Sequence, residues 1–346
     1  MSKFIRFEEK NNCTKSQWNA WLEQFEDRHI YQEYEFLENH SSAKKNIYRV
    51  CLLDGGGKII AIAQGVIILL PFQGAILNFR GGPVFKKIGL QSDCDKNLKE
   101  FIAKIIGDLR LNYRYFYLNA KFFSEKSPRS EIALQESLLC KLFLERDPYL
   151  TYIVKLEENI AENIKKFDSK WRNQMRKAQG SDQEITFNSE DDSILKFVNL
   201  YKEMCELKGL KLNKNIKIEL INIRDNLTDK FKVLIVHVNK IPVCGCIVLL
   251  QNTNAYYYLA ASSKIGRDGN FSNLMIVSLL EKLKNYHVDK LDLVGIDPKK
   301  NWGTFNFKRG IGGYPLSYLG EWQYGSNPVI MLLFSFALYL KSRNLN

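Results

Sequence analysis

The sequence predicts a mixed α/β protein, with α+β-type mixed sheets, built from two similar domains in tandem. The 346 residues are enough for two ordinary domains. Of these residues 45% are hydrophobic and 12% aromatic, which is sufficient to bury a core in each domain. In addition, one order of apolar and amphipathic stretches occurs twice along the chain. We therefore expect two sheets, each covered by its own helices.

The first copy of this order begins at Tyr48. The stretch YRVCLLDGGGKIIAIAQGVIILLPFQGAILNFRGG predicts three strands, separated by a glycine-rich turn and a proline-containing turn. Residues 95–112 predict a helix, because apolar residues recur at helical spacing on one face. Those residues are Leu98, Ile102, Ile105, Ile106 and Leu109. The segment YRYFYLNA, 113–120, predicts the closing strand.

The second copy begins at Phe231 and repeats the order. FKVLIVHV, VCGCIVLLQ and AYYYLAAS predict three strands joined by short turns. A helix is expected from about 271 to 286, and KLDLVGID predicts the closing strand. Asp147 and Pro148 interrupt the pattern between the copies, so we predict domain 1 over 1–148 and domain 2 over 149–318. Two copies of this length are too long and too few for a solenoid.

This order of elements is similar to that of GNAT-type N-acyltransferase domains, and a tandem pair points to acyl transfer to an amine. Fold alone does not fix function, so a duplicated binding module stays open at this point. Relatives that use acetyl-CoA carry an Arg/Gln-x-x-Gly-x-Gly/Ala turn before the main helix, where backbone amides hold the pyrophosphate. Neither SSKIGRDGNFSN nor KKIGLQSDCDKN has this frame. CoA is therefore not expected as the acyl donor.

A net charge of +12 favours anionic partners, and the stretch KKFDSKWRNQMRKAQGSD, 165–182, concentrates the cations. It predicts a helix of about four turns that packs on the fold by an apolar stripe. The stripe consists of Trp171, Met175 and Ala178. The candidate ligands for phosphates of tRNA or of a nucleotide are Lys170, Arg172, Arg176 and Lys177. The alternative is a solvated basic face without a ligand.

A second candidate is TFNFKRGIGG, 304–313. Phe305 and Phe307 alternate on an expected strand, and Lys308 and Arg309 follow. A Lys at a strand end reaches a developing oxyanion or a phosphate. The glycines that come next would let a bulky or planar ligand approach the backbone. The alternative is a glycine-rich bend with a solvated Lys.

Other polar residues are weaker candidates. Tyr257 and Tyr258 should point to opposite faces of their strand, and a tyrosine that faces a cleft would order a substrate through its hydroxyl. Asp292 and Asp297 at the end of the next strand fit caps better than catalytic acids. The histidines and cysteines are not spaced as metal ligands, so no metal is expected.

The termini indicate a cytoplasmic protein. The N-terminus lacks the apolar core of a signal peptide, and no apolar run is long enough to span a bilayer. The longest apolar stretch, PVIMLLFSFALYLK over 328–341, fits a buried helix or one that lies on a surface.

Five segments, taken in order, resemble the landmarks of the Fem family, the FemABX-like aminoacyltransferases. They are ILNFRGGPVF (76–85), YLTYIVKLEENIAENIKKFDSKWRNQMRKAQ (149–179), AYYYLAAS (255–262), KLDLVGI (290–296) and FNFKRGIGG (305–313). The resemblance spans roughly residues 20 to 325. It implies two GNAT-like domains, in the compact form without a coiled-coil arm, and a C-terminal segment, 319–346, that returns to domain 1.

The resemblance also implies roles for residues. In the family a Lys that follows a Phe is held to stabilise the oxyanion, and these positions are Lys308 and Phe307 here. Phe36 replaces a Trp of the family pattern, and His40 replaces a Lys that meets substrate phosphate. Asn119 replaces an acid, and an amide is not a general base. The candidate substrate contacts are His40, Asn119, Tyr257, Tyr258 and Arg309.

The leading hypothesis is an aminoacyltransferase without a cofactor. It would move an amino acid from aminoacyl-tRNA to an amine of a nucleotide- or lipid-linked peptidoglycan or other envelope precursor, in the cytoplasm or at the inner face of the plasma membrane. One alternative is a thioester-dependent N-acyltransferase acting on an amino sugar or metabolite. Another is a non-catalytic polyanion-binding protein. The general base, the amino acid and the oligomeric state stay open.

Overall fold

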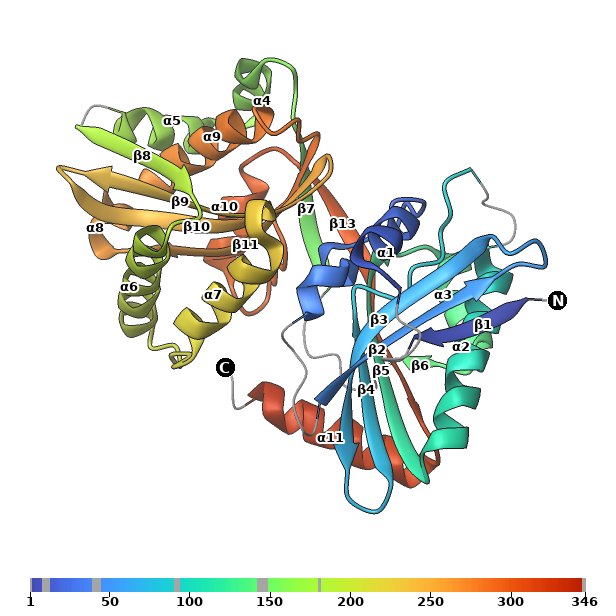
Figure 1. Cartoon of the computed structure of the whole chain (residues 1–346). Coiled ribbons are helices and arrows are strands. Elements are labelled where there is room, and N and C mark those ends of the chain that lie inside the picture. The colour runs from blue at the N-terminus through green and yellow to red at the C-terminus, as the bar shows by residue number, and fades with distance from the viewer. Residues whose placement is uncertain are drawn as a thin grey trace. The chain divides into compact units, whose positions relative to one another are not determined.

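The computed structural model divides the chain into two compact units (Figure 1). Unit 1 comprises residues 1–149 and 317–345, and unit 2 comprises residues 150–316. The sequence-based boundaries, at 148 and 318, lie within two residues of these. The structure describes residues 2–7, 13–38, 45–89, 94–141, 149–179 and 182–343.

Unit 1 is a six-stranded mixed sheet in the order β1-β2-β3-β4-β5-β13. The strands are β1 (Lys3–Phe7), β2 (Lys45–Leu53), β3 (Ile59–Leu70), β4 (Gly74–Arg80), β5 (Tyr115–Glu125) and β13 (Tyr314–Gly325), and the short β6 (Cys140–Lys141) also pairs with β13. β4 and β5 are parallel, and the other neighbours are antiparallel. The helices are α1 (Lys15–Leu22), η1 (Ile30–Gln32), η2 (Tyr34–Leu37), α2 (Cys94–Asn112), α3 (Pro128–Glu136) and α11 (Pro328–Arg343).

The core of unit 1 forms between the sheet and α2. All five residues of the predicted apolar face are buried to 1% exposure or less, because α2 lays this face on the sheet. The opposing strand residues include Phe116, Leu118, Ala120 and Phe122 of β5, which alternate toward the core as the period of a strand requires. The helix predicted over 95–112 is therefore confirmed.

Unit 2 repeats the strand order of unit 1, as β8-β9-β10-β11-β12-β7. Its strands are β7 (Leu150–Lys155), β8 (Gln183–Asn188), β9 (Phe231–Val238), β10 (Ile241–Gln251), β11 (Asn254–Ser262) and β12 (Lys290–Asp292). Its helices are α4 (Ile160–Lys166), α5 (Ser169–Ala178), α6 (Asp191–Lys208), α7 (Ile216–Leu227), η3 (Thr228–Lys230), α8 (Lys264–Asp268), α9 (Phe271–Lys284) and α10 (Trp302–Arg309). The parallel pair is again the fourth and fifth strand, β11 and β12.

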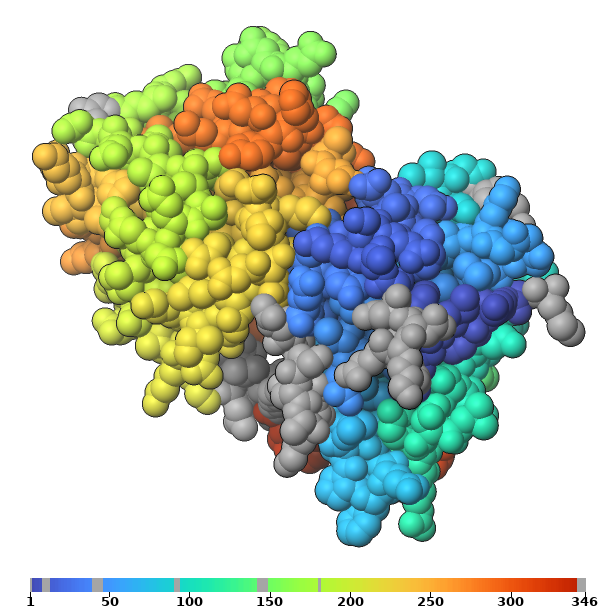
Figure 2. All heavy atoms as spheres, viewed as in Figure 1, coloured from blue at the N-terminus to red at the C-terminus, as the bar shows by residue number. Residues whose placement is uncertain are grey.

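Helices cover the sheet of unit 2 in layers. α6 contacts β9, β10 and β11, and with α7 it forms a continuous surface in Figure 2. α9 contacts β9 and β10 on its inner side and α4 and α5 on its outer side. Because α9 lies between the sheet and a further helical layer, it is apolar on almost every face, and ten of its fourteen residues are buried.

The basic stretch 165–182 is two helices, which corrects the expectation of a single one. α4 ends at Lys166, and α5 begins at Ser169 after two residues of extended backbone. The break lets Phe167 point into the core, where its ring meets that of Trp171 edge-on at 4.6 Å. The predicted apolar stripe of α5 is confirmed, since Trp171, Met175 and Ala178 are all buried.

None of the helices within the described ranges has both the length and the apolarity that crossing a bilayer requires.

Candidate functional site

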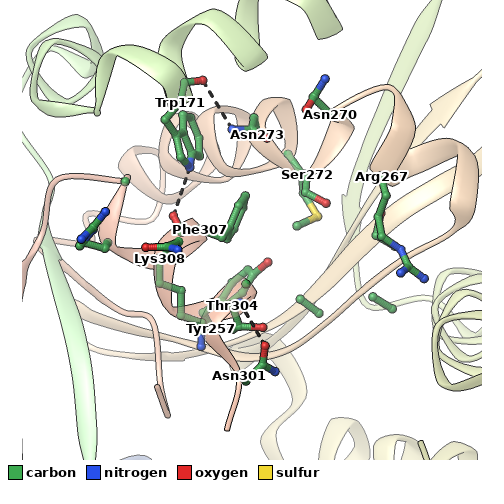
Figure 3. Close-up of a pocket in the computed structure, with 18 of the residues that line it drawn as sticks. Trp171, Tyr257, Arg267, Asn270, Ser272, Asn273, Asn301, Thr304, Phe307 and Lys308 are labelled. Carbon is green, nitrogen blue, oxygen red and sulfur yellow. Dashed lines mark hydrogen bonds between the residues drawn. The ribbon is translucent and has the colours of Figure 1, made fainter. Parts of the chain in front are cut away.

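The candidate site of unit 2 lies where β11 and β12 part. These parallel strands pair at only three positions, the last of which joins Tyr256 to Asp292. β11 then continues to Ser262, whereas β12 ends. A cavity of about 910 Å³ lies beside the free part of β11, and it is also lined by α10, the first residues of α5 and α9, and the end of α6 (Figure 3).

β11 contains a β-bulge beside this cavity. Tyr257 faces Val248 of β10 and Leu259 faces Ile247, so that Tyr258 is an extra residue on β11. Tyr257 and Tyr258 both line the cavity. The expectation that they point to opposite faces rests on regular alternation, which the bulge interrupts at this place. Burial raises the pKa of the Tyr257 hydroxyl, which stays protonated.

The segment that contains Phe305 and Phe307 is the helix α10, which corrects the expectation of a strand. Asn301 caps it, since its Oδ1 accepts a hydrogen bond from the N–H of Thr304 at 3.1 Å. The carbonyl of Phe307 accepts a hydrogen bond from Nε1 of Trp171 at 3.2 Å. Two aromatics with one residue between them imitate strand alternation, and the Asn cap was the overlooked helix signal.

Lys308 is buried at the inner end of α10, with 8% of its surface exposed. Its Nζ donates hydrogen bonds to the carbonyl oxygens of Val294 (2.5 Å) and Gly295 (3.0 Å), and lies 6.0 Å from the centre of the Tyr257 ring. Burial lowers the pKa of Lys308 to about 8, and the negative charge of Asp292 opposes part of this shift. An ammonium group has three donors, so one is left for an oxygen of a ligand.

The loop after β12 holds those carbonyls in place. Val294 has φ of 51°, a conformation that a β-branched residue adopts only under constraint. The constraint comes from Asp292, whose Oδ1 accepts hydrogen bonds from the N–H of Val294 (2.7 Å) and from the hydroxyl of Thr151. Asp297 accepts from two backbone N–H groups of the next turn, both at 2.9 Å. Both acids therefore bond to backbone, as predicted for caps.

The glycines after α10 bring the chain against itself, and of the three only Gly310 lines the cavity. Gly312 has φ of 77°, and a Cβ there would lie 2.3 Å from the carbonyl oxygen of Lys166. A Cβ at Gly310 would lie 2.6 Å from Cδ1 of Trp171. These close contacts hold the end of α10 against α4 and α5, and thereby fix the position of Lys308.

Cations predominate on the wall of the cavity. They are Lys170, Lys208, Arg267, Lys308 and Arg309. Asp168 is the one carboxylate among the described residues of this wall. Burial lowers the pKa of Lys208, and the positive charge of Arg267 adds to this effect. Figure 3 shows Arg267 and Lys308 on opposite sides of the cavity, so an extended anionic ligand would meet positive charge at both ends.

Only one of the four predicted phosphate ligands of α5 lines the cavity, and it is Lys170. Arg172 donates to the carbonyl of Lys165 at 2.8 Å, and Arg176 donates to Oδ1 of Asn173 at 3.0 Å. Lys177 is exposed outside the cavity wall. Sequence reasoning missed Lys208 and Arg267, because they belong to α6 and α8 and meet only in the folded chain.

Sequence reasoning also missed Trp302. It opens α10, lines the cavity and is 59% exposed, while its ring lies 5.3 Å from that of Phe305. An exposed tryptophan on a cationic cavity wall is suited to stack on a nucleobase. The sequence signal that could have indicated Trp302 is the run Asn-Trp-Gly-Thr, in which the tryptophan directly follows the Asn301 helix cap.

The candidates of unit 1 are not part of this cavity. Asn119 lies on β5, is 6% exposed, and its Oδ1 has no hydrogen-bond partner within the described ranges. Phe36 is buried in η2 and meets Tyr31 edge-on at 4.7 Å. His40 lies outside the described residues. Within the same ranges, no three His, Cys, Asp or Glu side chains gather in a way that would hold a metal ion.

Comparisons with known proteins establish the fold. No protein-family model matches the sequence, and no curated protein matches it significantly. The structure is similar to that of FemX, with a TM-score of 0.79 at 16% identity, over 96% of this chain and all of the other. It is also similar to a tandem GNAT protein from the clavulanic acid biosynthesis pathway, with a TM-score of 0.55 at 9% identity, over 95% of this chain and 99% of the other. A third similar structure is that of L-PGS from Bacillus licheniformis, with a TM-score of 0.53 at 12% identity, over 95% of this chain and 98% of the other. The predicted tandem GNAT fold of the FemABX type is confirmed.

Proposed function

We propose that this protein is an aminoacyltransferase that moves an amino acid from aminoacyl-tRNA to an amine of a peptidoglycan or other cell-envelope precursor. The observation that carries the proposal is the buried Lys308 ammonium at the end of a cation-lined cavity of about 910 Å³, in a fold similar to that of FemX. The acceptor class follows from the Fem-like order of sequence motifs. Because charged tRNA is the donor, we place the reaction in the cytoplasm.

The cavity wall suits the acceptor end of a tRNA. Lys170, Lys208 and Arg267 would contact phosphates, and Trp302 would stack on a terminal base. Lys308 lies beyond them, beside Tyr257, where the aminoacyl ester would be held. An ester carbonyl held there would lie next to a positive charge that is shielded from water, and such a charge stabilises an oxyanion more strongly than an exposed one.

The reaction proceeds through a tetrahedral intermediate. The neutral amine of the acceptor attacks the ester carbonyl carbon, a C–N bond forms, and the carbonyl oxygen becomes an oxyanion. The free donor of Lys308 hydrogen-bonds that oxyanion without giving up its proton. The C–O bond to the tRNA ribose then breaks, the amine loses a proton and the ribose oxygen gains one. The products are an amide and deacylated tRNA, and no resident cofactor takes part.

A thioester donor is the second candidate. The first residues of the 14-residue helix α9 border the cavity together with Arg267, and a helix N-terminus beside a cation suits the pyrophosphate of a CoA-like donor. The donor experiment must therefore separate the two classes.

The decisive experiment incubates the purified protein with total tRNA charged with labelled amino acids and with a panel of envelope precursors. We expect label to move into an RNase-resistant product, and the label that moves names the amino acid. Parallel reactions contain acyl-CoA in place of charged tRNA. Turnover with acyl-CoA alone would establish the second candidate and overturn the first.

A third set of reactions tests the role of Lys308 even if the panel contains no suitable acceptor. Lys308 in the proposed role should also support slow hydrolysis or hydroxylaminolysis of the bound aminoacyl-tRNA ester, which needs no acceptor. Wild type should accelerate this release, and Lys308→Met should not. Release that is equal in the two proteins, together with no transfer, would overturn the proposal.

A further inference from the structure

The C-terminal helix α11 of unit 1 presents a wholly apolar outer face. Its inner face packs on the sheet, where Phe334 stacks on Tyr117 at 5.3 Å and Ser335 bonds to Gln323. Its outer face carries large residues at positions i, i+3, i+4, i+7 and i+11, each 44–66% exposed. They are Val329, Leu332, Leu333, Phe336 and Leu340. Water-facing helix surfaces are ordinarily polar, so this stripe is built to be covered.

Two further apolar side chains lie toward the end of unit 1 where α11 begins. Phe72 in the β3–β4 turn is 83% exposed and Leu111 at the end of α2 is 89% exposed. The backbone connects these places: Arg114 donates to Gln73 and Ser326 donates to Phe116, both at 2.9 Å. We refer to Phe72, Leu111 and the outer stripe of α11 as the α11 patch.

The charges beside the α11 patch are positive. Arg110 and Arg114 are exposed next to Leu111, and the residues of α11 that form the outer stripe include no acid. The nearby Asp108 is already paired, with Arg6 at 3.0 Å and with the hydroxyl of Tyr48 at 2.8 Å. An apolar surface with a cationic margin complements an anionic lipid headgroup layer.

We propose that the α11 patch docks unit 1 on the surface of a bilayer that contains anionic phospholipids. The outer stripe of α11 enters the boundary between headgroups and acyl chains, Phe72 and Leu111 insert beside it, and the arginines contact lipid phosphates. A protruding turn and a helix that is apolar on both faces suit a fluid apolar phase, which adapts to their uneven shape. Docking does not depend on the proposed aminoacyl transfer, and it is measured without any reaction.

The test measures binding of the full chain to vesicles by co-flotation. We expect binding to vesicles of mixed phosphatidylcholine and phosphatidylglycerol, and weaker binding to phosphatidylcholine alone. Leu332→Glu with Phe336→Glu should reduce the partition coefficient by about tenfold or more, because two inserted apolar groups are replaced by charges. Arg110→Gln with Arg114→Gln should reduce binding to the anionic vesicles by about tenfold and leave binding to phosphatidylcholine unchanged.

The matched control is Ile132→Glu with Ile218→Glu, which replaces exposed apolar residues elsewhere (55% and 62% exposed). Ile132 lies on α3, which an Arg129–Asp95 ion pair joins to the first turn of α2, at the opposite end from Leu111. This control should bind vesicles as wild type does, and thermal unfolding should show that all variants are folded. Absence of vesicle binding by wild type would overturn the proposal. So would sedimentation showing a dimer that the α11 substitutions dissociate, because a second copy would then cover the patch.

Discussion

The two units share one strand order but differ at the pair of parallel strands. In unit 1, β4 and β5 pair at seven positions, from Gly74 with Tyr115 to Arg80 with Lys121. In unit 2, β11 and β12 pair at three. The longer pairing leaves a closed sheet, whereas the shorter one leaves the cavity that Lys308 faces. The same topology therefore yields a scaffold or a site according to where one strand stops.

The stop itself has a local cause in the sequence. β5 runs on for eleven residues, and residues 116–120 are all buried, so both of its faces are covered there. After Asp292 the chain turns, with Val294 and Gly295 at positive φ and the aspartate bonded back to the turn. In a continued strand, the carbonyls of Val294 and Gly295 would accept hydrogen bonds from a neighbouring strand. Here they accept hydrogen bonds from Lys308.

The largest expected effect tests whether only unit 2 carries the reactive charge. Lys308→Met should lower the rate of aminoacyl transfer about a hundredfold, because one oxyanion donor is lost. Lys299→Met, an exposed neighbour in the preceding turn, is the control and should transfer at the wild-type rate. Lys121→Met changes the last pair of the closed sheet in unit 1, and an equal loss there would break the comparison between the units.

The next effect concerns the cations of the cavity wall. Lys208→Glu with Arg267→Glu should raise the KM for charged tRNA by about tenfold or more and make binding less dependent on salt. Lys177→Glu reverses a charge on α5 outside the cavity wall and should change the KM much less. Equal effects of the two substitutions would indicate a diffuse basic surface rather than a cavity that binds the donor.

A pH profile sharpens the assignment of Lys308. Only its protonated form has the charge, and the fraction of Lys308 in this form should fall about tenfold for each pH unit above its pKa of about 8. Lys308→Arg keeps a charge throughout this range. The ratio of the wild-type rate to the Lys308→Arg rate cancels the ionisation of the acceptor amine, and it should fall as the pH rises. A ratio that is constant with pH would exclude Lys308 as the titrating group.

The smallest expected effect is on stability. The folded pKa of Lys308 is below its unfolded value, so between about pH 8 and 10.5 the unfolded state binds more protons and stability rises with pH. Relative to Lys308→Met, the free energy of unfolding of the wild type should increase by roughly 1 kcal/mol from pH 7 to pH 9. Urea unfolding at the two pH values measures this change. A flat difference would show that Lys308 is more hydrated than its burial indicates.

Most regular helices and strands could be predicted from the sequence, whereas the segments that connect them could not. The apolar face of α2 and the hairpins of unit 2 depend on local periodicity, which the sequence states directly. α10 was mistaken for a strand, because Phe305 and Phe307 repeat at the strand period while their helix is set by the Asn301 cap.

The candidate site was predicted only where a single segment supplies it. Lys308, Phe307 and Tyr257 lie in segments whose motifs can be recognised locally, and all three line the cavity. Lys208 and Arg267 come from helices that are distant in the sequence, and their proximity depends on packing that no local pattern states. The bulge at Tyr258 was likewise invisible, because it depends on the register with β10.

The position of β13 has a consequence for the order in which the protein is made. β13 supplies the strand next to β5 in unit 1, yet the ribosome synthesises it after all of unit 2. A nascent chain that has emerged to residue 149 therefore has an open edge along β5, which is available for wrong pairing with other strands. Unit 2 needs no later segment for its sheet, because β7 precedes the rest of that unit and fills the equivalent place. The domain begun first is completed last.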